Sequence, residues 1–149
     1  MKMLLLSAVL MLSSVHAGSA FAAPSRAPAA APAPAQVPAG AKVTFISPKD
    51  GATVSPKFTV KFNVSGMTLE KAGSVKSGTG HHHLIVDGGP VPAGEVVAKD
   101  ATHIHLGNAQ TETELNLTPG KHTLTLQFAD GAHMSYGPEM AQTITVNVK

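Results

Sequence analysis

The sequence contains no cysteine, no tryptophan and a single tyrosine among its 149 residues. Without cysteine, disulfides, thiolate metal ligands and cysteine nucleophiles are excluded. Arginine is scarce as well: Arg26 is the only one, and no other lysine or arginine except Lys2 precedes Lys42. From Lys42 onward, nine lysines balance nine aspartates and glutamates. The formal charge of that region is therefore zero, which argues against a nucleic-acid-binding surface.

Long apolar runs are absent except at the N-terminus. Lys2 provides a positive charge, residues 3–12 are largely apolar, and Ala20-Phe21-Ala22 has the small residues of a signal-peptidase site. This pattern predicts a signal peptide over residues 1–22, a mature chain that begins at Ala23, and a periplasmic or secreted protein. The alternative is a retained membrane anchor, but the apolar run is too short to span a bilayer comfortably. We therefore expect no transmembrane segment in the mature chain.

Residues 23–41 differ in composition from the rest of the chain. Nine of these nineteen residues are alanine and five are proline. Because proline removes backbone donors and interrupts helices, we predict an extended, semi-stiff linker that spaces a folded domain from a surface or partner. A segment without any function is the alternative.

Residues 42–149 form the predicted folded domain, and their apolar residues repeat with a period of two. Apolar residues alternate with polar ones from Phe58 to Val64, and the segments 123–128 and 144–149 repeat the pattern. Such alternation is typical of β-strands with one buried face. Shorter candidate strands make about seven in total, at residues 43–45, 81–87, 103–106 and 115–117. We predict an all-β fold, an immunoglobulin-like β-sandwich, with a small β-barrel as the alternative.

One turn signal separates two of these candidate strands. Thr118-Pro119-Gly120-Lys121 lies between the apolar alternations that contain Leu115 and Leu124. Proline followed by glycine favours a tight turn. We therefore predict a hairpin that joins the two strands.

Histidine is the residue type in unusual supply, and seven of the eight histidines follow residue 80. His81, His82 and His83 are consecutive within a candidate strand. Since side chains alternate along a strand, His81 and His83 share one face, whereas His82 points to the other. His103 and His105 form a second pair of the same spacing. Neutral imidazole is a good ligand for zinc and copper, so two such pairs in one small domain indicate a metal site.

Two more histidines lie where they would complete such a site. His122 follows the predicted hairpin turn, and His133 lies in a glycine-containing loop beside Met134. We predict that copper or zinc is bound by a set drawn from His81, His83, His105, His122 and His133. Further candidates are His103, Met134, whose thioether would favour Cu(I), and the carboxylate of Asp130. The alternative is that all of these histidines are ordinary solvated or hydrogen-bonded side chains.

Several strings of the sequence resemble a known family. The string Gly80-His81-His82-His83-Leu84-Ile85-Val86-Asp87 is similar to the signature of a family of secreted bacterial domains, domain of unknown function 4399. The segments 45–52, 110–112, 119–124 and 130–133 are similar to its other marks. The resemblance covers essentially all of residues 42–149 and implies a secreted β domain. It also implies that five histidines stand at motif positions, namely His81, His83, His105, His122 and His133. It implies no activity.

Three classes of function remain open. The first is a periplasmic or secreted metal-binding module for the storage or delivery of a metal ion or for protection against it. Its expected partners are the metal ion and an envelope protein or metal-delivery protein. The second is a non-catalytic interaction or structural domain of the cell envelope. The third is a copper-dependent redox enzyme of the superoxide dismutase type, since residues 103–107 are similar to the His-x-His strand of those enzymes. The domain lacks their disulfide cysteines and any arginine. No catalytic residue is predicted, and we expect a binding module rather than an enzyme.

Overall fold

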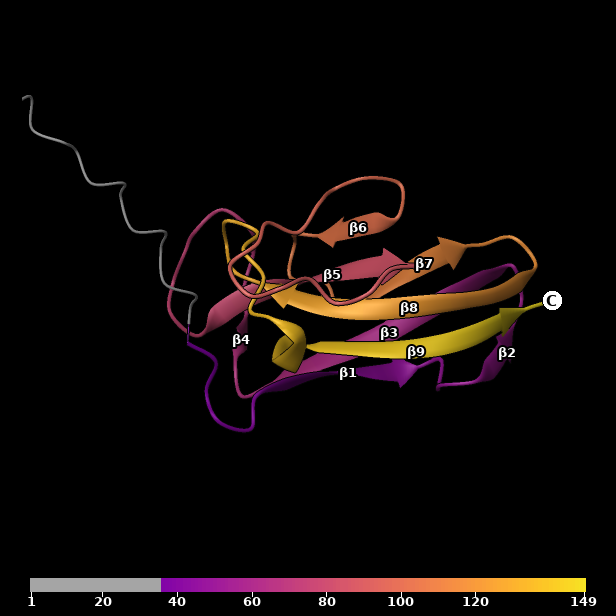
Figure 1. Cartoon of the computed structure of the whole chain (residues 1–149), viewed down its shortest axis with the longest axis horizontal. Coiled ribbons are helices and arrows are strands. Elements are labelled where there is room, and N and C mark those ends of the chain that lie inside the picture. The colour runs from indigo at the N-terminus through magenta and orange to yellow at the C-terminus, as the bar shows by residue number, and fades with distance from the viewer. Residues whose placement is uncertain (1–35) are drawn as a thin grey trace, which may run out of the picture.

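The computed structural model describes residues 36–149 (Figure 1). The predicted signal peptide and residues 23–35 of the predicted linker lie outside the described residues. The first strand begins at Lys42, the residue at which the sequence predicts the folded domain to begin. Ahead of it, Val37 and Ala41 pack against the hydrophobic core. The end of the Ala/Pro-rich segment is therefore part of the folded domain.

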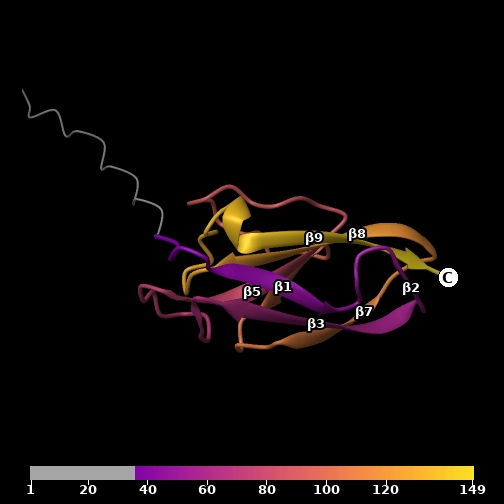
Figure 2. The same ribbon diagram turned by 90° about the horizontal axis from the view of Figure 1, so that it is seen from below.

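Two sheets pack face to face, as predicted for a β-sandwich (Figure 2). The smaller sheet has the order β1-β3-β7 and consists of β1 (Lys42–Ser47), β3 (Lys57–Ser65) and β7 (Glu112–Asn116). The larger sheet has the order β2-β9-β8-β5-β4, with β6 also paired to β5. Its strands are β2 (Ala52–Val54), β9 (Ala141–Val148), β8 (Gly120–Ala129), β5 (Thr79–Val86), β4 (Thr68–Leu69) and β6 (His103–Leu106). A single turn of 3-10 helix, η1 (Pro138–Met140), precedes β9.

The period-two pattern is confirmed in β3. Val60 and Phe62 are fully buried, whereas Thr59, Lys61 and Asn63 between and beside them are exposed. The buried residues of both sheets form one hydrophobic core, which holds the two layers together because its burial removes apolar surface from water. The residues described include no helix long and apolar enough to cross a membrane.

Strand β8 departs from the simple pattern, because both of its faces are buried. Leu124, Leu126 and Phe128 face the core as predicted, but Thr125 and Gln127 on the other face are fully buried too. The connection between β5 and β6 covers this polar face, where the Gln127 Oε1 accepts a hydrogen bond of 3.0 Å from the Val91 N–H. A polar side chain can be buried in this way because the covering backbone satisfies it.

The predicted hairpin at residues 118–121 is wrong. Strand β7 pairs with β3 in the smaller sheet, whereas β8 pairs with β5 and β9 in the larger one. The segment between them is therefore a crossover from one sheet to the other, as in Greek-key sandwiches. The turn residues bend the chain as expected, but the strand that each neighbour pairs with is decided by the packing of the whole domain. The two very short strands β2 and β4 account for the excess over the seven strands predicted.

Candidate metal centre

The centre is built on strand β5, at the edge where β6 joins the larger sheet. Alternation along β5 directs His81 and His83 away from the core, on the face that the loops cover. In the register of β5 and β6, His83 lies directly opposite His105. Side chains of such facing pairs are neighbours, so three histidines gather on one face of two strands. The prediction that His81 and His83 share a face follows from the same alternation.

A fourth histidine comes from the loop after β8. The Asp130 Oδ1 accepts hydrogen bonds from the N–H groups of Ala132, at 2.8 Å, and Met134, at 2.9 Å. The His133 N–H donates to the Asp130 carbonyl at 2.9 Å, and His133 has a left-handed backbone with φ of 67°. This tight turn returns the chain over Ala129, the residue that pairs with His81. Asp130 therefore positions His133 above β5.

The four rings converge on a single point. His81 Nε2 lies 3.0 Å from His83 Nε2 and 3.1 Å from His133 Nδ1. The ring centroid of His105 lies 5.0 Å from that of His81 and 4.7 Å from that of His133. One ring nitrogen from each of the four histidines lies within 4.8 Å of all the others.

Two of the distances between ring nitrogens match what one metal ion requires. Zinc or copper lies about 2.0–2.1 Å from an imidazole nitrogen, so two nitrogens on one ion are separated by roughly 2.9–3.4 Å for angles between square and tetrahedral. Two separations in the group, 3.0 and 3.1 Å, fall within that interval. His105 Nε2 is buried and has no hydrogen-bond partner among the described residues. Its lone pair or proton is left without a protein partner, as expected of a nitrogen that awaits a ligand.

Burial keeps the histidines of the group in the neutral form that binds metals. Burial, together with the positive charges that His105 and His133 would carry, lowers the pKa of His81 to about 4. Burial likewise lowers the pKa of His83 to about 3, with His81 and His105 adding to the effect. The pKa of His105 is lowered too, and burial is the largest cause. Neutral imidazole rings near pH 7 need not release protons before they bind an ion.

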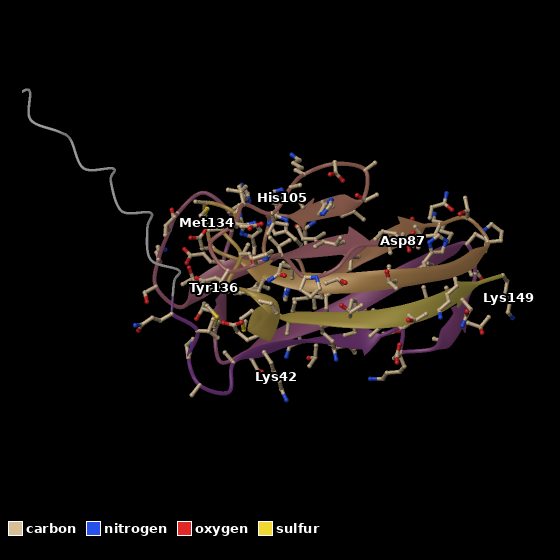
Figure 3. All side chains as sticks on the ribbon, viewed as in Figure 1. Lys42, Asp87, His105, Met134, Tyr136 and Lys149 are labelled. Atoms are coloured by element: carbon tan, nitrogen blue, oxygen red, sulfur yellow. The ribbon has the colours of Figure 1, made fainter. Side chains whose placement is uncertain are left out.

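The structure does not bring His122 to this group. His122 lies at the opposite end of β8, seven positions from Ala129, which corresponds to roughly 23 Å along a strand. Its Nδ1 lies 2.8 Å from the Asp87 Oδ2, and its Nε2–H donates to the Thr118 carbonyl at 2.9 Å. The hydrogen bond that the ring donates to the Asp87 carboxylate raises the pKa of His122. Both ring nitrogens are occupied, and Figure 3 shows Asp87 toward the end of the molecule away from His105.

The other candidates have separate places. His103 Nδ1 lies 2.9 Å from the Asp100 Oδ1 at the other end of β6, outside the group. His82 faces the core, as the alternation predicts, where its ring contacts Phe62 and Phe128 edge-on. Met134 is labelled near His105 at the same end of the molecule in Figure 3, but it supplies no member of the four-nitrogen group. The Asp130 carboxylate belongs to the supporting turn.

Two glycines leave room for this arrangement. A Cβ atom on Gly107 would collide with the ring of His105, 2.5 Å from its Nε2. A Cβ atom on Gly131 would collide with the backbone of Ser74, in the loop against which the His133 turn packs. Sequence reasoning missed both glycines. Gly107 follows the His103-Ile104-His105 pair within two residues, and this proximity is the one signal that pointed to it.

Residues 60–149 match the family described as Domain of unknown function (DUF4399). The match covers more than half of the chain. The chain belongs to the DUF4399 family. The matched region includes all four histidines of the group. The family resemblance predicted from residues 80–87 is confirmed. No curated protein and no solved structure matches this DUF4399 chain. Its function must therefore be argued from the geometry of the four histidines.

Proposed function

We propose that the domain is a metal-binding module that holds one copper or zinc ion through His81, His83, His105 and His133. The observation that carries this proposal is the convergence of four ring nitrogens within 4.8 Å of one another. Three of the four rings come from paired strands, so the ion would be held by rigid elements. Such positioning limits the loss of conformational entropy on binding.

A hydrogen-bonded cluster of histidines without an ion is the competing explanation. It accounts for only one of the two contacts of His81 as a full hydrogen bond, because His83 and His133 both approach its Nε2. In a neutral ring that nitrogen has either one proton or one lone pair. The cluster also leaves His105 Nε2 and the Nδ1 atoms of His81 and His83 buried without partners among the described residues. An ion bound through His105 Nε2 would give that nitrogen a partner and would remove the need for protons between the rings. The metal site therefore satisfies more of the buried polar atoms.

The donor set favours copper over zinc. All four donors are imidazole nitrogens, with no thiolate, since the sequence has no cysteine. For such ligands the affinity order of divalent ions places Cu(II) above Zn(II). With a signal peptide over residues 1–22, the module would act in the periplasm or outside the cell, in storage, delivery or protection. The Ala/Pro-rich segment would connect it to an envelope or delivery partner.

Calorimetric titration of the metal-free protein with Cu(II) and Zn(II) tests the proposal. The protein is produced with its own N-terminal segment and without a histidine tag, so that N-terminal sequencing also tests cleavage after Ala22. We expect one ion per chain and tighter binding of Cu(II). In a His105→Gln/His133→Gln variant, two of the four ligands are lost, and the affinity should fall by more than about 100-fold.

A His103→Gln/His122→Gln variant is the matched control, because it removes two histidines that lie outside the group. Its affinity should equal that of the unmodified protein within about twofold. Circular dichroism of each variant checks that the β-sandwich is retained. Equal weakening in both double variants, or weak binding that neither alters, would exclude the site and favour the envelope interaction domain.

A further inference from the structure

A cavity of about 270 Å³ opens beside the four histidines. Its lining includes three of the four rings, those of His83, His105 and His133, together with the segment from Val96 to Lys99. His81 does not line the cavity and is fully buried. An ion held by the four rings would therefore have His81 behind it and the cavity in front of it.

The charge around this position is positive on balance once an ion is bound. Four neutral imidazoles supply no negative charge, so a divalent ion keeps its full charge in the site. Asp130 carries one negative charge close to the group, where its Oδ1 accepts hydrogen bonds from two backbone N–H groups. That charge offsets only one of the two positive charges of the ion. Lys99 lies at the cavity.

The ammonium group of Lys99 is not neutralised by a carboxylate. None of the ion pairs between residues 36 and 149 includes Lys99, although Lys57, Lys61 and Lys76 each pair with a glutamate. Asp100 is adjacent to Lys99 in the sequence, but its carboxylate contacts the Nδ1 atom of His103 instead. Together with the ion, Lys99 gives the cavity a positive potential that only an anion entering from solvent would balance.

Size restricts the anion to a small one. Pockets that hold drug-sized molecules measure about 300–1,000 Å³, and this cavity is smaller. Val96, Val97 and Ala98 cover part of it with methyl groups, which offer nothing to a large polar ligand. Cu(II) with four nitrogen ligands accepts one more donor in a tetragonal site.

We propose that this cavity binds a small inorganic anion, which coordinates the metal ion directly and is attracted by Lys99. The proposal rests on the metal site proposed above, and it assigns to that site an exchangeable position. It gives the DUF4399 domain a second ligand in addition to its ion.

Azide is the probe, because it is a small anion and its coordination to Cu(II) produces a charge-transfer band. The copper-loaded protein is titrated with azide and followed by visible absorption and electron paramagnetic resonance. We expect a saturable band. Removing one exposed charge in Lys99→Met should weaken azide binding about three- to fivefold, and Lys99→Glu should weaken it more. The differences should shrink at high salt, because exposed charges are screened.

Lys121→Met is the matched control, since Lys121 is an exposed lysine at the far end of β8, and it should bind azide like the unmodified protein. Imidazole, a neutral ligand, should bind equally well to the Lys99 and Lys121 variants. A copper-loaded protein that gives no azide band, or Lys99 variants that bind azide with unchanged affinity, would overturn this inference and leave the metal site standing. Failure to bind copper at all would overturn both.

Discussion

His82 is a histidine in a place that usually holds an apolar side chain. It is fully buried, and its ring lies edge-on against Phe62 of β3 and Phe128 of β8. Neither ring nitrogen has a hydrogen-bond partner among residues 36–149. In immunoglobulin domains a tryptophan on the third strand packs against the disulfide between the second and sixth strands. Here, without cysteine or tryptophan, a histidine packs between two phenylalanines inside the sandwich.

Because the two nitrogens of His82 are buried without partners, the substitution His82→Leu should raise stability. Leaving a buried polar group unsatisfied costs about 1–3 kcal/mol, and leucine has no such group. We expect the free energy of unfolding in urea to increase by about 1 kcal/mol. Copper affinity should stay unchanged, because His82 points away from the metal group. A marked loss of stability would indicate that the ring has a partner, for example a buried water molecule.

Gly107 is the residue that gives the His105 ring its room. Its φ is not in the left-handed region, so alanine fits the backbone, and only the ring would have to move. Gly107→Ala should therefore lower copper affinity by about tenfold, with a change in stability of less than about 1 kcal/mol. Gly89→Ala is the control, because a Cβ atom there meets nothing within 4 Å. Calorimetry on the two variants makes the comparison, and equal affinities would show that His105 is not a ligand.

At the scale of elements, the connection from β5 to β6 is held in place by strand β8. The Gln127 side chain accepts a hydrogen bond from the Val91 N–H at 3.0 Å and donates one to the Gly137 carbonyl at 3.0 Å. The Ser135 hydroxyl donates to the Val91 carbonyl at 2.8 Å. These bonds attach the connection at Val91 to β8 and to the segment that follows it, and the same connection supplies Val97 and Lys99 to the cavity.

Gln127→Leu should therefore loosen this connection. The substitution leaves the Val91 N–H and the Gly137 carbonyl without their partner, which costs about 1–3 kcal/mol. Hydrogen exchange measured by mass spectrometry should become faster over residues 87–99 and stay unchanged in β3. If exchange rises equally in both segments, the effect is a general loss of stability and the side chain has no special role in the connection.

At the scale of the whole molecule, the buried histidines make the stability of the metal-free domain depend on pH. The pKa is about 4 for His81 and His82 and about 3 for His83, against an ordinary value of 6.5. Between pH 6.5 and about 4 the unfolded chain therefore binds protons that the folded chain does not. Stability should fall as the pH falls through that interval. The raised pKa of His122 acts in the opposite direction, but one exposed ion pair does not offset three buried rings.

Urea unfolding of the metal-free protein at a series of pH values measures this dependence. Each buried histidine contributes a slope of up to about 1.4 kcal/mol per pH unit within its interval. The His82→Leu variant should have a smaller slope by about that amount, because one proton fewer is taken up on unfolding. A stability that is constant from pH 7 to about pH 5 would show that the rings are hydrated in the folded state.

The sequence supports a prediction wherever local periodicity decides the outcome. The alternation in residues 58–64 identifies β3, and the same rule separates His82 from His81 and His83. Pairing between distant segments has no such local signal. The wrong hairpin at residues 118–121 and the buried polar face of β8 both depend on which strand or loop packs against a segment, and that is settled by the packing of the whole core.

The sequence by itself determined the β-sandwich, the family and the face on which His81 and His83 lie, because side-chain direction along a strand is fixed by backbone geometry. Only the tertiary structure decided which other histidines join them. The register of β5 and β6 places His105 opposite His83, and the Asp130 turn returns His133 over the same strand. His122 stands at the opposite end of β8, because the register of β5 and β8 pairs His81 with Ala129, at the other end of the strand. Alternation along a strand fixes the face on which a side chain lies. The neighbours that the side chain meets across the sheet depend on contacts between residues far apart in the chain.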